Sequence, residues 1–260
     1  MELQLFQVDA FATHVFTGNP AAVCPLDSWL PDTVMQKIAE ENNLSETVFF
    51  VKNENGYHIR WFTPTIEVDL CGHATLASAY VIFEHLNYDQ DEIHFESLSG
   101  PLSVKRCEFG YQLNFPKQAP VDCPIPDAAM AAFGRQPIQC LKHQDYIFVF
   151  DDEEFVKSVK PDMNVLKQLD MRGVVITCAS EQYDFVSRCF APNYGIDEDP
   201  VTGATFTQLT PMWQDKLNKT SLNAKQVSAR GGEVHCQLDN DRVLISGKAV
   251  LFMKGSIYVR

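Results

Sequence analysis

The sequence has no run of about 20 apolar residues, the length that a membrane-spanning helix needs. Its N-terminus, MELQLFQVDAF, carries an early acid and lacks a basic segment followed by an apolar block, so we expect no signal peptide. Together the two absences predict a cytoplasmic protein without a membrane partner.

Positive charge is also scarce. The chain has 21 Lys and Arg against 34 Asp and Glu, a formal net charge of -13. Nucleic acid and anionic membranes would be repelled by such a surface, and we exclude both as partners. A local positive pocket for a small acidic metabolite remains compatible with it. The 260 residues, 45% of them apolar, are enough for one large domain or two ordinary ones.

The sequence lacks several motifs that indicate a metal, a cofactor or a known type of catalytic site. The eight cysteines form no C-x-x-C pair and are expected to be reduced thiols, mostly buried. The histidines show no H-x-x-x-H or H-E-x-x-H spacing, which argues against zinc. There is no G-x-G-x-x-G after a strand, no G-x-x-x-x-G-K and no G-x-S-x-G, so nucleotide sites and a serine hydrolase lack support. We expect neither a metal nor a cofactor.

The chain repeats itself. RWFTP at residues 60–64 recurs as RCFAP at residues 188–192, an offset of 128. Each copy follows a strand-like run and leads through an acidic loop into a small-residue stretch and a helix, at residues 74–86 and 204–217. The first helix is apolar almost all round, as expected of a helix surrounded by protein. Chance matches are common at this length, but the shared order of features favours duplication.

Other patterns complete an α+β prediction. Strand runs at 47–51 and 146–150 are bounded by turn residues, and Pro31-Asp32 and Pro161-Asp162 each open an amphipathic helix. Four prolines between residues 116 and 126 interrupt regular structure. We therefore predict two halves, 1–118 and 119–260, in which the last strand is able to pack on the first half.

The two small-residue stretches suggest a binding site. Gly72 and Gly203 each stand where a long helix begins, with unpaired N–H groups and the positive dipole end directed outward. Two such ends facing one cleft would bind a carboxylate or a developing enolate without metal. Each stretch alone reads equally well as an ordinary helix cap.

The two halves differ at one position that bears on catalysis. An offset of 128 places Glu46 on Val174, so only the first half has a carboxylate before its strand. Its apolar neighbours would raise the pKa of Glu46 toward values useful for acid–base catalysis, although a solvated strand-edge glutamate fits the pattern as well. His73 is either a neutral hydrogen-bonding group near the helix dipole or a packing residue. Asp199 either orients a substrate or caps a helix.

Five ordered motifs resemble the PhzF-like, or phenazine biosynthesis-like, isomerase family over essentially the whole chain. The motifs are VDAF with FTGNPAAV at 8–23, NLSET at 43–47, FTP with EVDLCGHAT at 62–75, FAP with EDPVTG at 190–203, and RGG at 230–232.

The resemblance implies a diaminopimelate epimerase-like fold: two similar halves, each a curved sheet or barrel around a central helix, with the active site between them. It implies a cofactor-free isomerase of biosynthetic metabolism that moves a proton on a small acidic molecule, and a homodimer is compatible with it. The implied catalytic residues are Glu46, His73 and Asp199. The implied substrate-binding residues are Asn19, Ser45, Gly72, Gly203 and Ala204.

The sequence departs from the family pattern at two positions. Ala204 replaces a common serine and Phe206 a common histidine, which predicts a less polar cleft. A catalytically silent binding protein of the same fold is therefore one alternative. An epimerase using Cys71, a thiol at a helix N-terminus where its pKa would drop, is another. Because the second thiol position of such an epimerase falls at Pro200, Cys71 is more readily explained as a packing residue.

Overall fold

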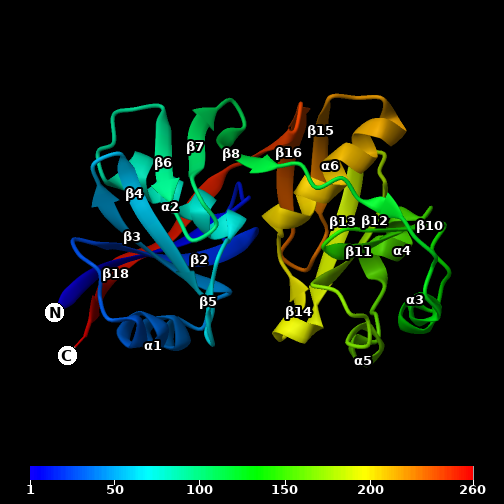
Figure 1. Ribbon diagram of the computed structural model, residues 1–260, viewed down its shortest axis with the longest axis horizontal. Coiled ribbons are helices and arrows are strands. Elements are labelled where there is room, and N and C mark those ends of the chain that lie inside the picture. Colours follow the sequence, from blue (N-terminus) through cyan, green and yellow to red (C-terminus); the bar gives the residue numbers. More distant parts are fainter. Residues whose placement is uncertain (260) are drawn as a thin grey trace. The chain divides into compact units, whose positions relative to one another are not determined.

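The computed structural model describes residues 1–259, which form two compact units. Unit 1 comprises Met1–Phe115 and Ile245–Arg260, and unit 2 comprises Pro116–Leu244. Within residues 1–259, no helix is both long and apolar enough to cross a membrane. The predicted mixture of helices and strands is confirmed in both units (Figure 1).

Unit 1 is built from a sheet and two helices: β1 (Glu2–Ala10), β2 (Asn19–Leu26), α1 (Asp32–Asn42), β3 (Glu46–Asn53), β4 (Gly56–Phe62), β5 (Glu67–Val68), α2 (Gly72–His85), β6 (Glu92–Glu96), β7 (Leu102–Cys107), β8 (Gly110–Pro116) and β18 (Ala249–Tyr258). The last strand, β18, pairs antiparallel with β1. The chain ends therefore lie together, and Val259 N donates to Met1 O at 2.9 Å.

Unit 2 contains further strands with four α-helices and one 3-10 helix: β9 (Val121–Asp122), α3 (Asp127–Phe133), β10 (Gln139–Lys142), β11 (Asp145–Val149), α4 (Glu153–Ser158), α5 (Met163–Leu166), β12 (Gly173–Ala179), β13 (Phe185–Ala191), η1 (Pro192–Tyr194), β14 (Ile196–Asp199), α6 (Gly203–Leu217), β15 (Ser221–Gln226), β16 (Gly232–Asp239) and β17 (Arg242–Gly247). The strand β17 begins in this unit and ends in unit 1.

Both units follow the same order of strand pairing. In unit 1, β2 runs parallel to β3, β3 antiparallel to β4, and β4 parallel to β6. In unit 2, β11, β12, β13 and β15 pair in the same senses. Each unit also has a further antiparallel strand at the corresponding place: β18 pairs with β1, and β9 pairs with β10. The repeated sequence motif thus corresponds to a repeated topology.

Helices α2 and α6 are the buried helices of their units. Eleven of the fourteen residues of α2 are buried, and the helix contacts β1, β2, β3, β7 and β18. A helix that meets protein on most sides needs small, apolar side chains, which explains its alanine-rich sequence. Helix α6 contacts β15 and β16 and buries ten of its fifteen residues.

The alignment of Glu46 with Val174 is wrong by one residue. Thr47 pairs with Phe62 in unit 1, and Val174 pairs with Phe190 in unit 2. The residues of the first pair are 15 positions apart and those of the second pair 16. The constant offset of 128 between the halves therefore fails by one residue at β3. Strand β3 begins at Glu46, and strand β12 begins at Gly173. The residue of unit 2 that corresponds to Glu46 is therefore Gly173, where a Cβ would lie 3.2 Å from Asp145 Oδ1.

The helix predicted after Pro161 is much shorter than its counterpart α1. Asp162, and not the proline, forms the N-cap of α5, with its carboxylate accepting from Asn164 N at 2.9 Å. Four residues later α5 ends at Leu166, and Leu169, expected on the same helix, is buried in the core from a position outside it.

A glycine sets the entry into β2. Gly18 has φ +68°, and a Cβ there would lie 2.2 Å from Ala10 O. We predict that Gly18→Ala lowers the free energy of unfolding of unit 1 by about 2 kcal/mol more than Gly100→Ala does. Gly100 also has positive φ (+98°) but open space around it, so it shares only the conformational cost. Urea unfolding monitors both variants, and equal losses would contradict the close contact.

Candidate active site

Glu46, His73 and Cys71 converge at the N-terminal end of α2 in unit 1. Glu46 is the first residue of β3, and His73 is the second residue of α2. Glu46 Oε2 lies 3.0 Å from His73 Nε2, and Cys71 Sγ lies 3.4 Å from His73 Nδ1. The side chains of His73 and Glu46 are only 6% and 12% exposed. The sequence prediction thus named residues that the fold brings together from segments 27 positions apart.

Asn19 and Ser45, also predicted, complete the group. Asn19 is the fully buried first residue of β2, and its Nδ2 lies 3.2 Å from His73 Nδ1. Ser45 Oγ donates to Asn19 Oδ1 at 3.3 Å. With the amide nitrogen donating, His73 Nδ1 is an acceptor and the ring proton sits on Nε2, facing Glu46. A chain of polar groups therefore fixes which face of the imidazole meets the carboxylate.

Glu46 has a distinctive environment for a carboxylate. Its Oε2 is buried and, within residues 1–259, makes no hydrogen bond of good geometry, because the contact with His73 is close but poorly aligned. Buried polar atoms are normally hydrogen-bonded, and exceptions concentrate at functional positions. This oxygen is therefore available to accept a proton.

The surroundings of His73 act against the expected neutral imidazole. Burial alone would lower the pKa of its imidazole, but Cys71 and the Glu46 carboxylate raise that pKa well above its ordinary value. The carboxylate is the decisive partner, since Cys71 is itself uncharged at neutral pH. An imidazolium would require the Asn19 amide to present its oxygen to Nδ1–H in place of its nitrogen.

The expected low pKa of Cys71 is also wrong. Although Cys71 is the N-cap of α2, burial raises the pKa of its thiol to about 11, and the nearby Glu46 carboxylate acts in the same direction. The structure also revises its counterpart in the second half. The N-cap of α6 is Thr202, so Cys71 corresponds to Thr202 and not to Pro200.

The Glu46, Cys71 and His73 side chains would also serve as metal ligands by type, with ligand atoms all within 4.8 Å of one another. Sequence spacing misses such a set, because its first member lies 25 residues before the second. The positive end of the α2 dipole opposes a cation there, however. The absence of a metal stays a prediction.

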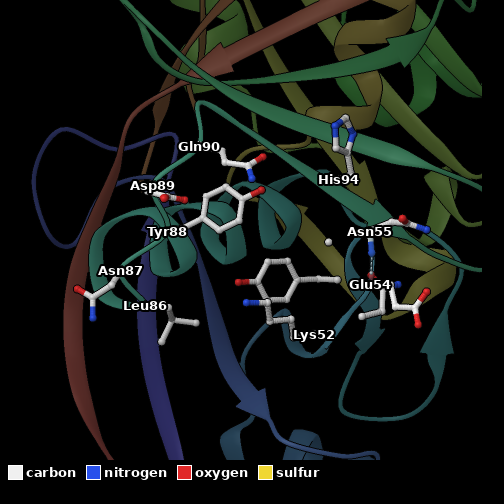
Figure 2. Close-up of a pocket in the computed structure, with 12 residues that line it drawn as sticks. Lys52, Glu54, Asn55, Leu86, Asn87, Tyr88, Asp89, Gln90 and His94 are labelled. Carbon is white, nitrogen blue, oxygen red and sulfur yellow. Dashed lines mark hydrogen bonds between the residues drawn. The ribbon is translucent and has the colours of Figure 1, made fainter.

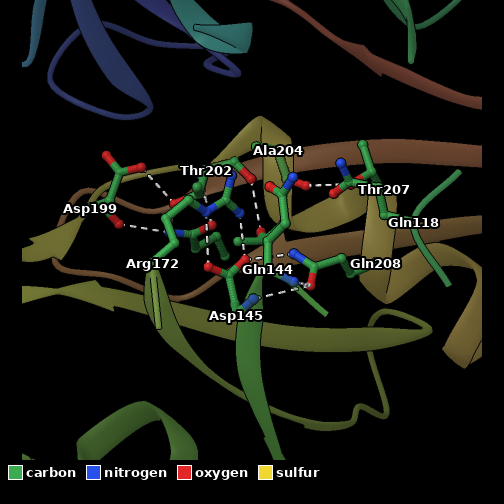
Figure 3. Close-up of polar contacts among 11 residues, drawn as sticks. Gln118, Gln144, Asp145, Arg172, Asp199, Thr202, Ala204, Thr207 and Gln208 are labelled. Atoms are coloured by element: carbon green, nitrogen blue, oxygen red, sulfur yellow. Dashed lines mark hydrogen bonds and ion pairs between the residues drawn. The ribbon is translucent and has the colours of Figure 1, made fainter. Parts of the chain in front are cut away.

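The predicted residues of unit 2 form a separate polar group (Figure 3). Asp199 is the last residue of β14, and Thr202 Oγ1 donates to its Oδ2 at 2.5 Å. Gln226, fully buried, accepts from Thr202 N at 2.9 Å and donates to Asp199 O at 2.6 Å. Gly203 and Ala204 then open α6. Asp199 therefore binds the hydroxyl of the N-cap residue.

Sequence reasoning missed a second set of contacts beside this group. Asp145 is 1% exposed and receives both Arg172, through two guanidinium nitrogens, and Gln208 Nε2 at 2.5 Å (Figure 3). The one available signal was Gln208, a polar residue within the mostly apolar first turns of α6. This network lies beside Gly173, so a side chain at that position would contact Asp145 closely.

The prediction that Phe206 makes the site less polar stays a prediction. Phe206 is fully buried and packs against Phe185 with ring centroids 6.1 Å apart. It belongs to the core of unit 2. Ala204, at the second position of α6, is half-buried and supplies no hydroxyl.

Unit 1 also contains a cavity that lies away from the predicted site residues. It has a volume of about 380 Å³ and is lined by the β3–β4 turn and the segment after α2, including Tyr57, Tyr88 and His94 (Figure 2). None of the predicted site residues is part of its lining. The polar group at α2 and this cavity are therefore distinct features of unit 1.

Comparison with known proteins agrees with this fold. The family model for phenazine biosynthesis-like protein (PhzC-PhzF) matches residues 8–255. An uncharacterized isomerase of Pseudomonas aeruginosa is 50% identical over 100% of both chains. The crystal structure of a PhzF-family phenazine biosynthesis protein from Enterococcus faecalis is 48% identical, covers 100% of both chains and has a TM-score of 0.98.

The fold extends to more distant proteins. The structure of a predicted epimerase from Pseudomonas aeruginosa, only 19% identical, covers 99% of this chain and 100% of its own with a TM-score of 0.73. The two-halved, epimerase-like fold expected from the sequence is confirmed. The chain belongs to the phenazine biosynthesis-like protein family, and it is an isomerase of that family.

The titration of His73 tests the contact with Glu46. We predict that the pKa of His73 in wild-type protein lies above its ordinary value of about 6.5 and falls in Glu46→Gln, because the amide removes the stabilising carboxylate. NMR of histidine-labelled protein measures this. His85, whose pKa is lowered by burial and then by Lys254, is the internal control and should not move.

The same contact affects stability. A raised folded-state pKa stabilises the protein fully below the unfolded value, and the stabilisation is lost as the pH rises through the folded pKa. Wild type should therefore exceed Glu46→Gln in stability most near about pH 6. A difference that grows at higher pH would contradict the assignment.

Proposed function

We propose that the chain moves a proton on a small carboxylic acid without a cofactor, with Glu46 as the acid–base group. The observation that carries this proposal is the buried Glu46 Oε2, which lacks a well-aligned hydrogen bond and lies 3.0 Å from His73 Nε2. A general base must be able to take a proton and to return it. The contact with His73 orients the Glu46 carboxylate and places beside it an imidazole whose charge can change.

The reaction has two proton transfers. The Glu46 carboxylate takes a proton from a carbon next to an electron-withdrawing group, and the electron pair of that C–H bond moves into the substrate. The protonated Glu46 then returns the proton to another carbon, which restores the enzyme. Backbone N–H groups of Gly72 and His73, in the first turn of α2, favour the negative charge that develops between the steps.

His73 acts through Glu46 in this scheme. While Glu46 is ionised, an imidazolium at Nε2 stabilises the carboxylate. Once Glu46 carries the substrate proton, that stabilisation is lost and the carboxylic acid is driven to release the proton again. Asn19 keeps the ring in place through Nδ1. The roles predicted for Asp199, Gly203 and Ala204 in binding the acid stay predictions.

An anionic substrate fits the site although the whole chain is acidic. The first turn of α2 has no acidic residue, and Cys71 and His73 of the buried polar group belong to that end of the helix. A helix N-terminus favours a carboxylate by about 0.3–1 kcal/mol at exposed positions, and by more where water is excluded. We therefore assign small carboxylic acids as the substrate class.

The epimerase alternative has little physical support. A thiol with a pKa near 11 is almost entirely protonated at neutral pH, so Cys71 is a poor base. Its counterpart in α6 is the hydroxyl of Thr202, which is a weaker acid still. The silent-binder alternative is separated by experiment: a panel of small carboxylic acids is incubated with protein in deuterated water, and only an isomerase incorporates deuterium.

We predict that Glu46→Gln lowers turnover by at least about 10²-fold while the fold stays intact, because the amide keeps the volume but cannot exchange the proton. Circular dichroism checks the fold, and deuterium incorporation measures turnover. The matched control is Glu54→Gln, an exposed position in the same unit. Activity of Glu46→Gln equal to that control would remove Glu46 from the mechanism.

We further predict that Cys71→Ala keeps activity within about tenfold of wild type, a barrier change of ~1.4 kcal/mol. The reason is that the buried, protonated thiol packs beside His73 and takes no part in proton transfer. A loss above about 10²-fold with unchanged substrate binding would instead have the size of a missing acid–base group, and would favour the thiol mechanism.

A further inference from the structure

Cys123 and Cys140 place their sulfur atoms 3.2 Å apart in unit 2. Cys123 follows β9 directly, and Cys140 lies within β10. The two strands pair antiparallel, with Asp122 opposite Leu141. Cys123 N continues this ladder by donating to Cys140 O at 2.9 Å. The two thiols are thus held opposite each other by backbone hydrogen bonds, and not by a chance side-chain contact.

The backbone geometry suits a covalent bond. Opposed residues in an antiparallel hydrogen-bonded pair have Cα atoms about 5.5 Å apart, within the range of about 4.4–6.8 Å that disulfides span. The sulfurs must approach to about 2.0 Å to bond. Rotations about the two Cα–Cβ bonds provide this movement, so the strands need not separate or shift register.

We propose that Cys123 and Cys140 are a redox modification site, which forms a reversible intrachain disulfide by exchange with a small disulfide such as glutathione disulfide. This site is independent of the proton-transfer chemistry at Glu46. The thiols are reduced in the resting protein and become linked when the surrounding thiol pool is oxidised.

The two cysteines have different parts in the exchange. Cys123 is half-buried and Cys140 is buried, so the small disulfide meets Cys123 first. The Cys123 thiolate attacks one sulfur of the small disulfide, forms a mixed disulfide and releases one small thiol. Cys140 then loses its proton to water, attacks the Cys123 sulfur and displaces the second small thiol. Two protein thiols are oxidised, and one small disulfide is reduced to two thiols.

The environment supports this order of events. Burial raises the pKa of the Cys140 thiol, and Cys123 raises it further. Cys140 is therefore slow to react with an oxidant in solution but is positioned beside the mixed disulfide. The half-buried Cys107 of unit 1 provides a comparison, because it lies opposite Gly110 and not opposite a cysteine.

The bond would close a loop around α3. The two cysteines are 17 positions apart, and the segment between them carries Phe133, which packs into the core of unit 2. A cross-link of this length removes conformational freedom from the unfolded chain. Oxidation should therefore stabilise unit 2, whose entering strand β9 has only two residues.

The full-length protein, equilibrated in glutathione buffers of increasing oxidation, tests the proposal. Free thiols are then alkylated, and the intact mass and a non-reducing peptide map are measured. We expect the loss of two hydrogen atoms, one linked peptide pair containing Cys123 and Cys140, reversal by dithiothreitol, and a rise in melting temperature of about 5 °C. Cys107→Ser should retain the cross-link, whereas Cys123→Ser should lose it together with the shift.

Three outcomes would overturn the proposal. One is a mixed disulfide that persists on Cys123 after prolonged exchange, another is a cross-link between other cysteines, and the third is a reduced pair in buffers that already modify Cys107. All three are measured on the wild-type chain, so the test does not depend on how well any variant folds.

Discussion

The burial of α2 within the sheet of unit 1 is the constraint on which the site depends. A helix enclosed on most sides must satisfy its own polar groups, and it does so internally. The hydroxyls of Thr75 and Ser78 donate hydrogen bonds to Cys71 O and Ala74 O at 2.6 and 2.8 Å. The helix axis is thereby fixed, and its N-terminal turn meets the starts of β2 and β3. His73 consequently faces Asn19 and Glu46 in one orientation.

The two units share this construction but differ in chemistry. In both, an arginine on a strand that precedes the buried helix binds a glutamate through two nitrogens and covers a phenylalanine ring: Arg60 with Glu67, and Arg188 with Glu198. These pairs anchor the segments that lead into α2 and α6. The Glu46 carboxylate is not repeated, since its counterpart is Gly173. The two units therefore share a scaffold, and unit 2 lacks the carboxylate that contacts His73 in unit 1.

The charge balance around His73 explains how a buried carboxylate is tolerated. An isolated buried carboxylate is costly, and a partner that can be cationic offsets the desolvation. That partner is a histidine, whose charge changes easily, so the stabilisation is adjustable. A lysine or arginine in its place would hold the carboxylate permanently ionised and oppose its protonation. The buried thiol of Cys71 fills the remaining space without adding charge.

The sequence by itself determined the order of helices and strands, the repeat, the buried character of α2 and, through family motifs, the candidates Glu46 and His73. The elements, the repeat and the buried helix follow from local periodicity and composition, which reflect burial, whereas the two candidate residues follow from the family motifs. Tertiary structure alone decided that Asn19 contacts His73 from 54 positions away, that Phe206 belongs to the core, and that Cys71 is protonated. It also decided that Cys123 meets Cys140. Such facts depend on strand register and on the solvation of each group, and a one-residue change in loop length, as between the two units, is enough to alter them.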